Sequence, residues 1–342
     1  MSLDADFINV TPENLAGEHL CCIIRSKKPH PGVEAKRQWL AERLREAHVF
    51  RKLDVKGCAF IEYAPLETAW VPVTGENYLY IYCLWVSGSL KGKGHGRALM
   101  EYCLADARAR GKSGVSVHSV DKGQHACQRP KSTLAASSSL AGVSPPASSS
   151  LPALIFSRWQ VLRSFSGADW ATGKADEAAG LPPGNEDNAA RCSRCPEKPY
   201  SPLSTECMLG AAKQKAWLSG QAFAKQYGFE TVDTTGYGYE LLALSFDGTV
   251  PAFAPSAKKG EIESQGLTVY YDRQCPYVHQ AVENVRRHCG ETGVPVSLIP
   301  VDTLEKAKSL PCVFNNWGVF YQGRFETVNL LDAGTLQRIL KR

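Results

Sequence analysis

The chain has 342 residues, 44% of them hydrophobic and 21% charged, a composition that allows two folded domains and excludes a wholly disordered chain. A net charge of +5 over this length is too weak to predict a nucleic-acid-binding surface, but it suits one small anionic ligand. The sequence contains no apolar run of about 18 residues, so no membrane span is predicted. Twelve cysteines without a recognisable signal peptide favour a reducing compartment, so we expect a cytoplasmic protein.

Residues 7–120 alternate between helical and strand patterns. Apolar residues recur at helical spacing in 33–47, which no Gly or Pro interrupts, and in 97–110, which ends at Gly111. Strands are predicted at 58–63, 78–86 and 115–120. Both faces of the strand at 78–86 are apolar or aromatic, which is typical of a central strand covered on both sides. If side chains alternate strictly along this strand, one face carries Tyr78, Tyr80, Tyr82, Leu84 and Val86.

Residues 121–212 differ in composition from the rest of the chain. Ser132–Ser150 holds eight serines in nineteen positions, and no charged residue lies between Lys131 and Arg158. Such a segment cannot offset the entropy of ordering, so we predict a long, disordered, low-complexity insertion. The predicted domain map is a first domain at 7–120 plus 213–250, the insertion at 121–212, a linker at 251–266 and a C-terminal domain at 267–342.

A glycine-rich turn joins the central strand to the next helix, with the sequence Lys91-Gly92-Lys93-Gly94-His95-Gly96-Arg97. Glycines let the backbone turn sharply and present N–H groups at a helix N-terminus, which binds anions. The basic side chains of this turn add positive charge. Neither the dinucleotide fingerprint nor the nucleotide phosphate loop is matched. The turn therefore predicts an anion site, the alternative being a turn that is rich in glycine for purely steric reasons.

This turn resembles the acetyl-CoA signature of the GCN5-related N-acetyltransferases (GNAT), which is Arg or Gln, two residues, Gly, one residue, and Gly or Ala. Lys91 stands in the first place, and Gly94 and Gly96 stand in the two small-residue places. The run Phe223–Phe229 is similar to the fourth helix of that family. The segments HVFRKLDVKGCAFIEYAP and LTVYYDRQCPY resemble the YoaP-like acetyltransferases, which join such a domain to a small C-terminal domain. The resemblance implies an α+β fold with a mixed central sheet flanked by helices.

The resemblance also implies a reaction and its participants. Acetyl-CoA would be the co-substrate, no metal would be needed, and the acceptor would be a small-molecule or peptide amine that attacks the thioester directly. Neither nucleic acid nor a membrane is expected as a partner. The residues implied in cofactor binding are Leu84, Val86, Lys91, Gly92, Lys93, Gly94, His95, Gly96 and Arg97. The backbone N–H of Leu84 is expected to polarise the thioester carbonyl.

The catalytic acid and base are less clearly marked. The family's acid is a Tyr four residues before the Gly of a Gly-Phe pair, and that position is Ala224, with Tyr227 three residues away. For a base, Glu62 and Tyr80 or Tyr82 are candidates, the alternative for Glu62 being a solvated strand charge. Ala224 leaves open a non-catalytic module that binds CoA or a protein partner.

The C-terminal segment contains a second notable turn. Cys275-Pro276-Tyr277-Val278 follows a strand pattern and opens a helix, which resembles the active turn of glutaredoxins with Val278 in place of the second Cys. We therefore predict a small thioredoxin-like α/β domain. A cysteine at a helix N-terminus is favoured as thiolate, which leaves open a thiol-redox protein that uses Cys275 beside a CoA-binding domain. Cys192 and Cys195 have metal spacing, but a single pair does not predict zinc.

We predict that replacing residues 124–210 with a short Gly-Ser linker leaves acetyl-CoA binding unchanged. The closure entropy of a loop grows only logarithmically with its length, so the first domain can fold around a long or a short connection. The thermal shift caused by acetyl-CoA measures the binding, and limited proteolysis of the full chain should cut first within this segment. If the deletion unfolds the protein, the insertion contributes to the core.

Overall fold

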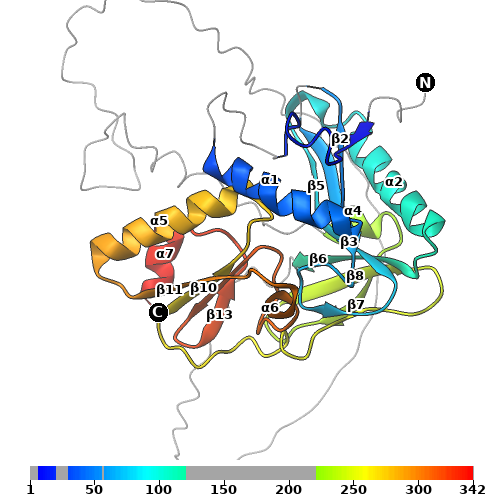
Figure 1. Cartoon of the computed structure of the whole chain (residues 1–342). Coiled ribbons are helices and arrows are strands. Elements are labelled where there is room, and N and C mark those ends of the chain that lie inside the picture. The colour runs from blue at the N-terminus through cyan, green and yellow to red at the C-terminus, as the bar shows by residue number, and fades with distance from the viewer. Residues whose placement is uncertain (1–6, 21–29, 56–57, 121–220, 342) are drawn as a thin grey trace, which may run out of the picture. The chain divides into compact units, whose positions relative to one another are not determined.

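The computed structural model describes residues 7–20, 30–55, 58–120 and 221–341, whose main element is a seven-stranded mixed sheet (Figure 1). The strand order is β1-β2-β3-β5-β6-β8-β7, and every pair is antiparallel except β5 with β6. The strands are β1 (Phe7–Asn9), β2 (Val49–Leu53), β3 (Ala59–Pro65), β5 (Tyr78–Val86), β6 (Gly114–Val120), β7 (Glu230–Thr234) and β8 (Tyr239–Ser245). The predicted mixed sheet with helices is thus confirmed.

The two faces of this sheet have different covers. Helix α1 (Pro31–Arg43) packs on one face, where Trp39 and Leu40 join a core that contains Tyr78 and Tyr80. Helices α2 (His95–Ala109) and α4 (Gln221–Lys225) pack on the other face, whose core includes Leu79. Short 3-10 helices follow α1 at Leu44–Glu46 (η2) and precede α2 at Gly88–Leu90 (η3). The central strand β5 is therefore buried on both sides, as its sequence predicts.

The strict alternation predicted along β5 is wrong beyond Tyr82. Glu62 pairs with Cys83 and Tyr63 pairs with Ile81, so Tyr82 is an extra residue in β5 and forms a β-bulge. Each residue after the bulge changes face. Leu84 and Val86 consequently join the α2 side of the sheet, whereas Tyr82 remains in the core on the α1 side. A bulge inserts one residue opposite its partner strand, and side-chain periodicity alone does not reveal it.

The C-terminal segment forms a second sheet of four strands in the order β11-β10-β12-β13. Strands β10 and β11 are parallel, and the other pairs are antiparallel. The elements are β10 (Leu267–Tyr271), α5 (Pro276–Thr292), β11 (Val296–Pro300), α6 (Leu304–Lys308), β12 (Trp317–Tyr321), β13 (Arg324–Thr327) and α7 (Ala333–Leu340). No helix among the described residues is long and apolar enough to cross a membrane.

The segment 251–266, predicted as a linker, packs against the rest of the described chain. Its strand β9 (Ala252–Phe253) pairs with β4 (Val73–Thr74), and Phe253 and Ala257 are buried in the core on the α1 side of the large sheet. Helix α1 also packs against α5, where a Cβ on Gly32 would meet the Pro276 carbonyl oxygen at 2.1 Å. The two sheets are thus connected by packed contacts. The insertion 121–212 lies outside the described residues, and the boundaries of the domain map stay predictions.

A buried histidine lies in the core on the α1 side of the large sheet. His118 on β6 is 1% exposed, and neither of its ring nitrogens has a hydrogen-bond partner. Its ring packs edge-on against Tyr80 with centroids 5.0 Å apart, and 5.2 Å from the ring of Phe253. Burial, assisted by the positive charge of Lys308, lowers the pKa of His118 to about 3. The folded protein therefore keeps this imidazole neutral.

We predict that His118→Leu reduces the loss of stability in mild acid. Below the ordinary pKa of 6.5, His118 binds a proton in the unfolded wild type but stays neutral in the folded protein. The free energy of unfolding therefore falls as the pH drops. Between about pH 6.5 and pH 5 the free energy of unfolding should fall by about 2 kcal/mol less in the variant than in the wild type, because one titrating group contributes about 1.4 kcal/mol per pH unit. Urea unfolding at both pH values measures this difference. Equal losses in the two proteins would contradict it.

Candidate active site

The parallel strands β5 and β6 part near the middle of the large sheet. Their pairing runs from Tyr78 with Gly114 to Tyr80 with Ser116, whereas β5 continues to Val86 and β6 stays paired with β8 as far as Val120. The edge of β5 that follows the bulge is thereby separated from β6. A strand edge of this kind can bind an extended ligand through its backbone.

The direction of the backbone N–H groups along this edge follows from one hydrogen bond. The N–H of Ser87, directly after β5, donates to the carbonyl oxygen of Cys58 beside β3, at 2.9 Å. Successive N–H groups of an extended strand point to opposite edges. The N–H groups of Val86 and Leu84 therefore point away from β3, toward the edge that β6 has left. This is the orientation required of a donor to a ligand lying between the strands.

The glycine turn has the conformation that only glycine adopts without strain. Gly92 has a φ of 75° and Gly94 a φ of 84°, and Gly94 is the N-cap of α2. No side chain caps this helix, so its first N–H groups face outward. Fifteen residues of helix place the positive end of a macrodipole at the turn. The local structure thus has the backbone geometry that can bind an anion.

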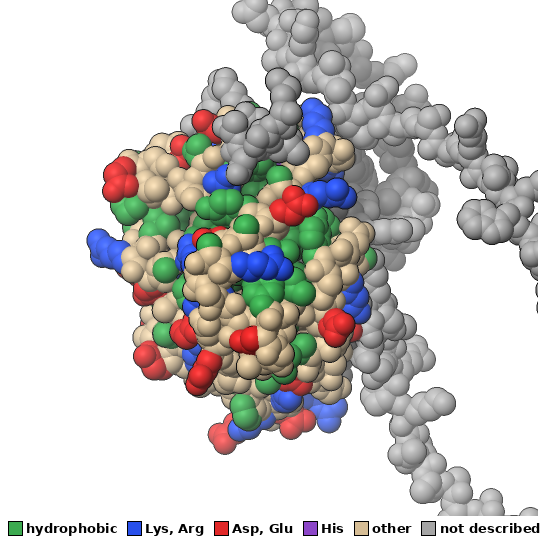
Figure 2. Space-filling view, turned by 90° about the vertical axis from the view of Figure 1, so that its right-hand side faces the viewer, with side chains coloured by type: hydrophobic (Ala, Val, Ile, Leu, Met, Phe, Trp, Pro, Cys, Tyr) green, Lys and Arg blue, Asp and Glu red, His purple; other side chains and the backbone are tan. Residues whose placement is uncertain are grey.

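A hollow of about 330 Å³ lies between this turn and the end of β5. Its lining residues are Leu84, Val86, Leu90, Lys91, Gly92, Gly94, His95, Gly96, Arg97 and Phe223. Eight of the nine residues predicted to bind the cofactor are among them, and Lys93 is not. Leu90 and Phe223 were not predicted. Leu90 directly precedes the turn in the sequence, whereas only the fold brings Phe223 to it. On the face seen in Figure 2, basic and acidic side chains are interspersed with apolar ones and do not form one charged patch.

The lining of the hollow combines positive charge with apolar side chains. A Cβ on Gly96 would contact the Phe223 ring and the Val86 side chain at 3.7 Å, so this glycine leaves room beside the helix. Nδ1 of His95 is buried without a partner, and the basic side chains of Lys91 and Arg97 border the same space. The turn thus offers charge at one end of the hollow and an apolar wall at the other.

Comparisons with known proteins agree with this geometry. Residues 16–129 match the model of the acetyltransferase (GNAT) family, and residues 295–338 match the YoaP-like family. The chain thus contains a GNAT acetyltransferase domain and a C-terminal YoaP-like segment. It is 25% identical over 336 residues to the Bacillus subtilis protein named uncharacterized N-acetyltransferase YoaP, covering 98% of both chains. It also matches the crystal structure of Ard1 from Thermoplasma volcanium at 13% identity, over 35% of this chain and 74% of that one, with a TM-score of 0.24.

Glu62 on β3 is buried and is not a solvated strand charge. It is 2% exposed and forms an ion pair with Lys36 of α1, which is 1% exposed. Its Oε1 also lies 2.9 Å from Nε2 of His48, and its Oε2 accepts a hydrogen bond from Nε2 of Gln274 at 2.7 Å. Gln274 in turn accepts from Asn316 at 2.8 Å. One carboxylate therefore connects α1, the start of β2, β3 and the C-terminal segment.

The charges of this cluster shift both acidic and basic groups. Burial raises the pKa of Glu62, but the nearby Lys36 ammonium and the hydrogen bond with His48 outweigh burial and hold it below its ordinary value. Burial lowers the pKa of His48, against the opposing effect of Glu62. At neutral pH Glu62 is thus ionised and His48 is neutral. A carboxylate held in this way is a weak base.

The other candidate bases are buried hydroxyls. Tyr80 donates to Oδ1 of Asn315 at 3.0 Å, and Nδ2 of Asn315 donates to the carbonyl oxygen of Tyr82, the bulge residue, at 3.2 Å. The Tyr82 hydroxyl accepts from the N–H of Trp70 at 2.6 Å. Burial raises the pKa of both tyrosines well above the ordinary value, so both are neutral. Ala224 is 4% exposed and packs in the core on the α2 side.

Among the described residues, no three His, Cys, Asp or Glu side chains are grouped so as to hold a metal ion. Cys192 and Cys195 lie outside those residues. Cys275 is half-buried and is the N-cap of α5. It lines a second hollow, which has no lining residue in common with the first. The structure therefore places the residues of the two sequence motifs in separate sites.

We predict that Glu62→Gln destabilises the fold by about 3–5 kcal/mol, because the substitution leaves the Lys36 ammonium buried without its counter-charge. The double variant Lys36→Met with Glu62→Gln should recover at least about 1 kcal/mol of this loss, because both charges are then removed. Urea unfolding at neutral pH measures the wild type, Glu62→Gln, Lys36→Met and the double variant.

Asp302→Asn is the matched control, because it removes an exposed carboxylate that pairs with Lys306. This control should not change stability measurably. If the double variant is as unstable as the sum of its single changes, the two charges are not coupled and the ion pair is not what holds the cluster together.

Proposed function

We propose that the chain transfers the acetyl group of acetyl-CoA to the amine of a small molecule or peptide, by direct attack of the amine on the thioester. The observation that carries this proposal is the hollow that runs from the N-terminus of α2 to the separated edge of β5. Acetyl-CoA would supply a phosphorylated, extended thioester of the kind that such a site selects.

The turn would bind the pyrophosphate. The N–H groups of residues 94–97 lie at the positive end of the α2 dipole, where an anion is stabilised by hydrogen bonds and charge together. Lys91 and Arg97 add two positive side chains at the rim of the hollow. The apolar side chains of Phe223 and Leu90 would contact the neutral part of the cofactor. Lys93 does not line the hollow, and its positive charge is proposed to attract the pyrophosphate from outside it.

The edge of β5 would hold the arm and the acetyl group. An extended amide-containing arm can pair with a strand edge as an added strand does, and Leu84 and Val86 offer their N–H groups there. The N–H of Leu84 is proposed to donate to the thioester carbonyl oxygen. A fixed donor at the atom where negative charge develops lowers the barrier to attack.

The incoming ammonium must lose a proton to a base. Of the three candidates, Glu62, Tyr80 and Tyr82, Glu62 is the one that is ionised. Its three donors weaken it as a base, so Glu62 is proposed as the terminal acceptor of a water-mediated transfer. Ala224 offers no proton to the departing thiolate, and solvent is proposed to supply it. Amine-dependent release of free CoA separates this function from a module that only binds CoA.

For the C-terminal segment we propose a thioredoxin-like scaffold. The support is the strand order β11-β10-β12-β13, with α5 connecting the parallel pair β10 and β11. The acceptor is proposed to be an amine rather than a nucleic acid or a membrane. The composition of the chain supports a cytoplasmic location.

We predict that Gly96→Asp abolishes stabilisation by acetyl-CoA, whereas Gly96→Ala retains it. The added Cβ makes only ordinary contacts in both variants, but Asp also places a negative charge beside the proposed pyrophosphate site. Acetyl-CoA at about 100 times its Kd should stabilise the wild type and the Ala variant by about 2.7 kcal/mol, measured as a thermal shift.

Gly96 is preferred to Gly94 for this test, because the positive φ of Gly94 would add backbone strain to any substitution. An unchanged thermal shift in the Asp variant would contradict the site. Loss of the shift in the Ala variant as well would mean that space, and not charge, limits binding.

A further inference from the structure

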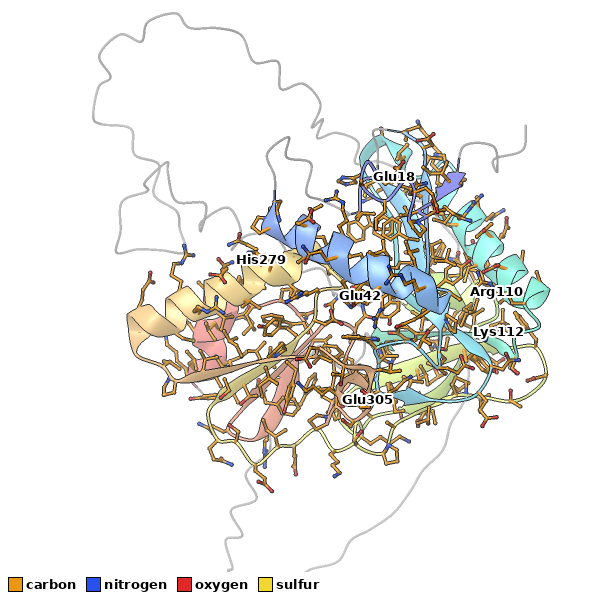
Figure 3. All side chains as sticks on the ribbon, viewed as in Figure 1. Glu18, Glu42, Arg110, Lys112, His279 and Glu305 are labelled. Atoms are coloured by element: carbon orange, nitrogen blue, oxygen red, sulfur yellow. The ribbon has the colours of Figure 1, made fainter. Side chains whose placement is uncertain are left out.

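A second hollow of about 240 Å³ lies at the N-terminus of α5, away from the acetyl-CoA site. Its lining residues are Gly32, Ala35, Tyr271, Asp272, Arg273, Cys275, Val278, His279, Val282, Glu283 and Arg286. Helix α1 forms one wall, and α5 with the end of β10 forms the other. In Figure 3, His279 marks the end of α5 that lies next to α1. Acetyl transfer as proposed above uses none of these residues.

An unpaired acidic side chain lines this hollow. Asp272 is 2% exposed; its Oδ1 accepts the N–H of Gln274 at 2.8 Å, whereas its Oδ2 is buried without a partner. A buried carboxyl oxygen without a partner is costly unless the group is protonated or serves a ligand. Asp272 follows β10 directly, three residues before Cys275, so the fold brings the carboxyl and the thiol to the same small space.

The thiol in this space is at a helix terminus. Cys275 is the N-cap of α5, whose 17 residues direct the positive end of their dipole at it, and Pro276 occupies the first helical position. This placement favours the thiolate, which is the nucleophilic form. Among the described residues Cys275 is the one thiol that lines the hollow. Val278, one turn further along the helix, stands where a second cysteine would be.

We propose that Cys275 exchanges disulfides with low-molecular-weight disulfides in this hollow, and that the Asp272 carboxyl protonates the thiolate that leaves. Burial raises the pKa of Asp272 to about 8, opposed by the N–H of Gln274 and by Lys36 and reinforced by Glu62. At neutral pH the carboxyl is therefore mostly protonated and can donate.

The exchange balances without a further redox partner. The Cys275 thiolate attacks one sulfur of the disulfide RSSR, a Cys275–S–S–R bond forms, and the R–S–S–R bond breaks. The leaving sulfur takes the Asp272 proton and departs as RSH. In the reverse half, a second RSH gives its proton to the Asp272 carboxylate and attacks the mixed disulfide, which restores the Cys275 thiolate and releases RSSR.

The charges around the hollow suit a disulfide that carries carboxylates. Arg273 is exposed at the rim, and His279 lies on α5 with its ring centroid 6.5 Å from that of His30, the N-cap of α1. Arg286 is paired with Glu283, so these two side chains cancel. The remaining positive group, Arg273, favours an anionic peptide disulfide, of which glutathione disulfide is the probe used below.

The test measures how fast mixed disulfides form at Cys275 in the reduced full chain, resolved by peptide mass spectrometry. With glutathione disulfide near pH 7, Asp272→Asn should slow the reaction at least about tenfold, because a general acid is lost. With dithiobis-nitrobenzoate the same variant should react at the wild-type rate, since its acidic leaving thiol needs no proton. Asp54→Asn, which removes an exposed carboxylate outside the hollow, is the matched control, and Cys275→Ser is the blank.

Asn keeps the oxygen that accepts the Gln274 N–H, and retention of the acetyl-CoA thermal shift confirms that the variant folds. The proposal is overturned if Asp272→Asn leaves the glutathione rate unchanged, or slows both disulfides equally. It is also overturned if Cys275 reacts no faster in the folded chain than in a peptide of residues 270–280. None of these outcomes depends on acetyl transfer.

Discussion

The carboxylate of Glu62 is the constraint on which most of the described structure depends. It lies under α1 with Lys36, His48 and Gln274 as its donors, and each donor comes from a different segment of the chain. A buried ionised carboxylate is stable only where donors surround its oxygens, so the positions of the segments that supply these donors are interdependent. The cluster explains why α1 is placed where it covers the tyrosine face of β5 and also borders α5.

The second determining feature is the bulge at Tyr82. It turns Leu84 and Val86 toward α2, and it lies where β5 and β6 separate. The same residue is fixed from the opposite side by Asn315 and Trp70. One irregularity thus supplies an apolar wall of the first hollow and the exposed strand edge, and hydrogen bonds from Asn315 and Trp70 hold it in place. Bulges next to reactive groups redirect side chains in this manner.

The sequence predicts local features well and long-range ones poorly. The glycine turn could be predicted directly, because its conformation and charge depend on neighbouring residues, and six of its seven residues line one hollow. The partners of Glu62 could not be predicted, because Lys36 and Gln274 lie 26 and 212 positions away from it. The bulge was missed because every residue of the strand is apolar or aromatic, so the pattern contains no polar residue to mark a change of face.

The hydrogen bonds of Asn315 have a consequence for how the two regions of this chain vary. Its amide bridges the Tyr80 hydroxyl and the Tyr82 carbonyl, while the neighbouring Val313 belongs to the same apolar core as those tyrosines. A chain that lost its C-terminal sheet would leave this aromatic face in water. The C-terminal region is therefore part of the folding unit of the acetyltransferase, and substitutions on the two sides of this contact are expected to be inherited together.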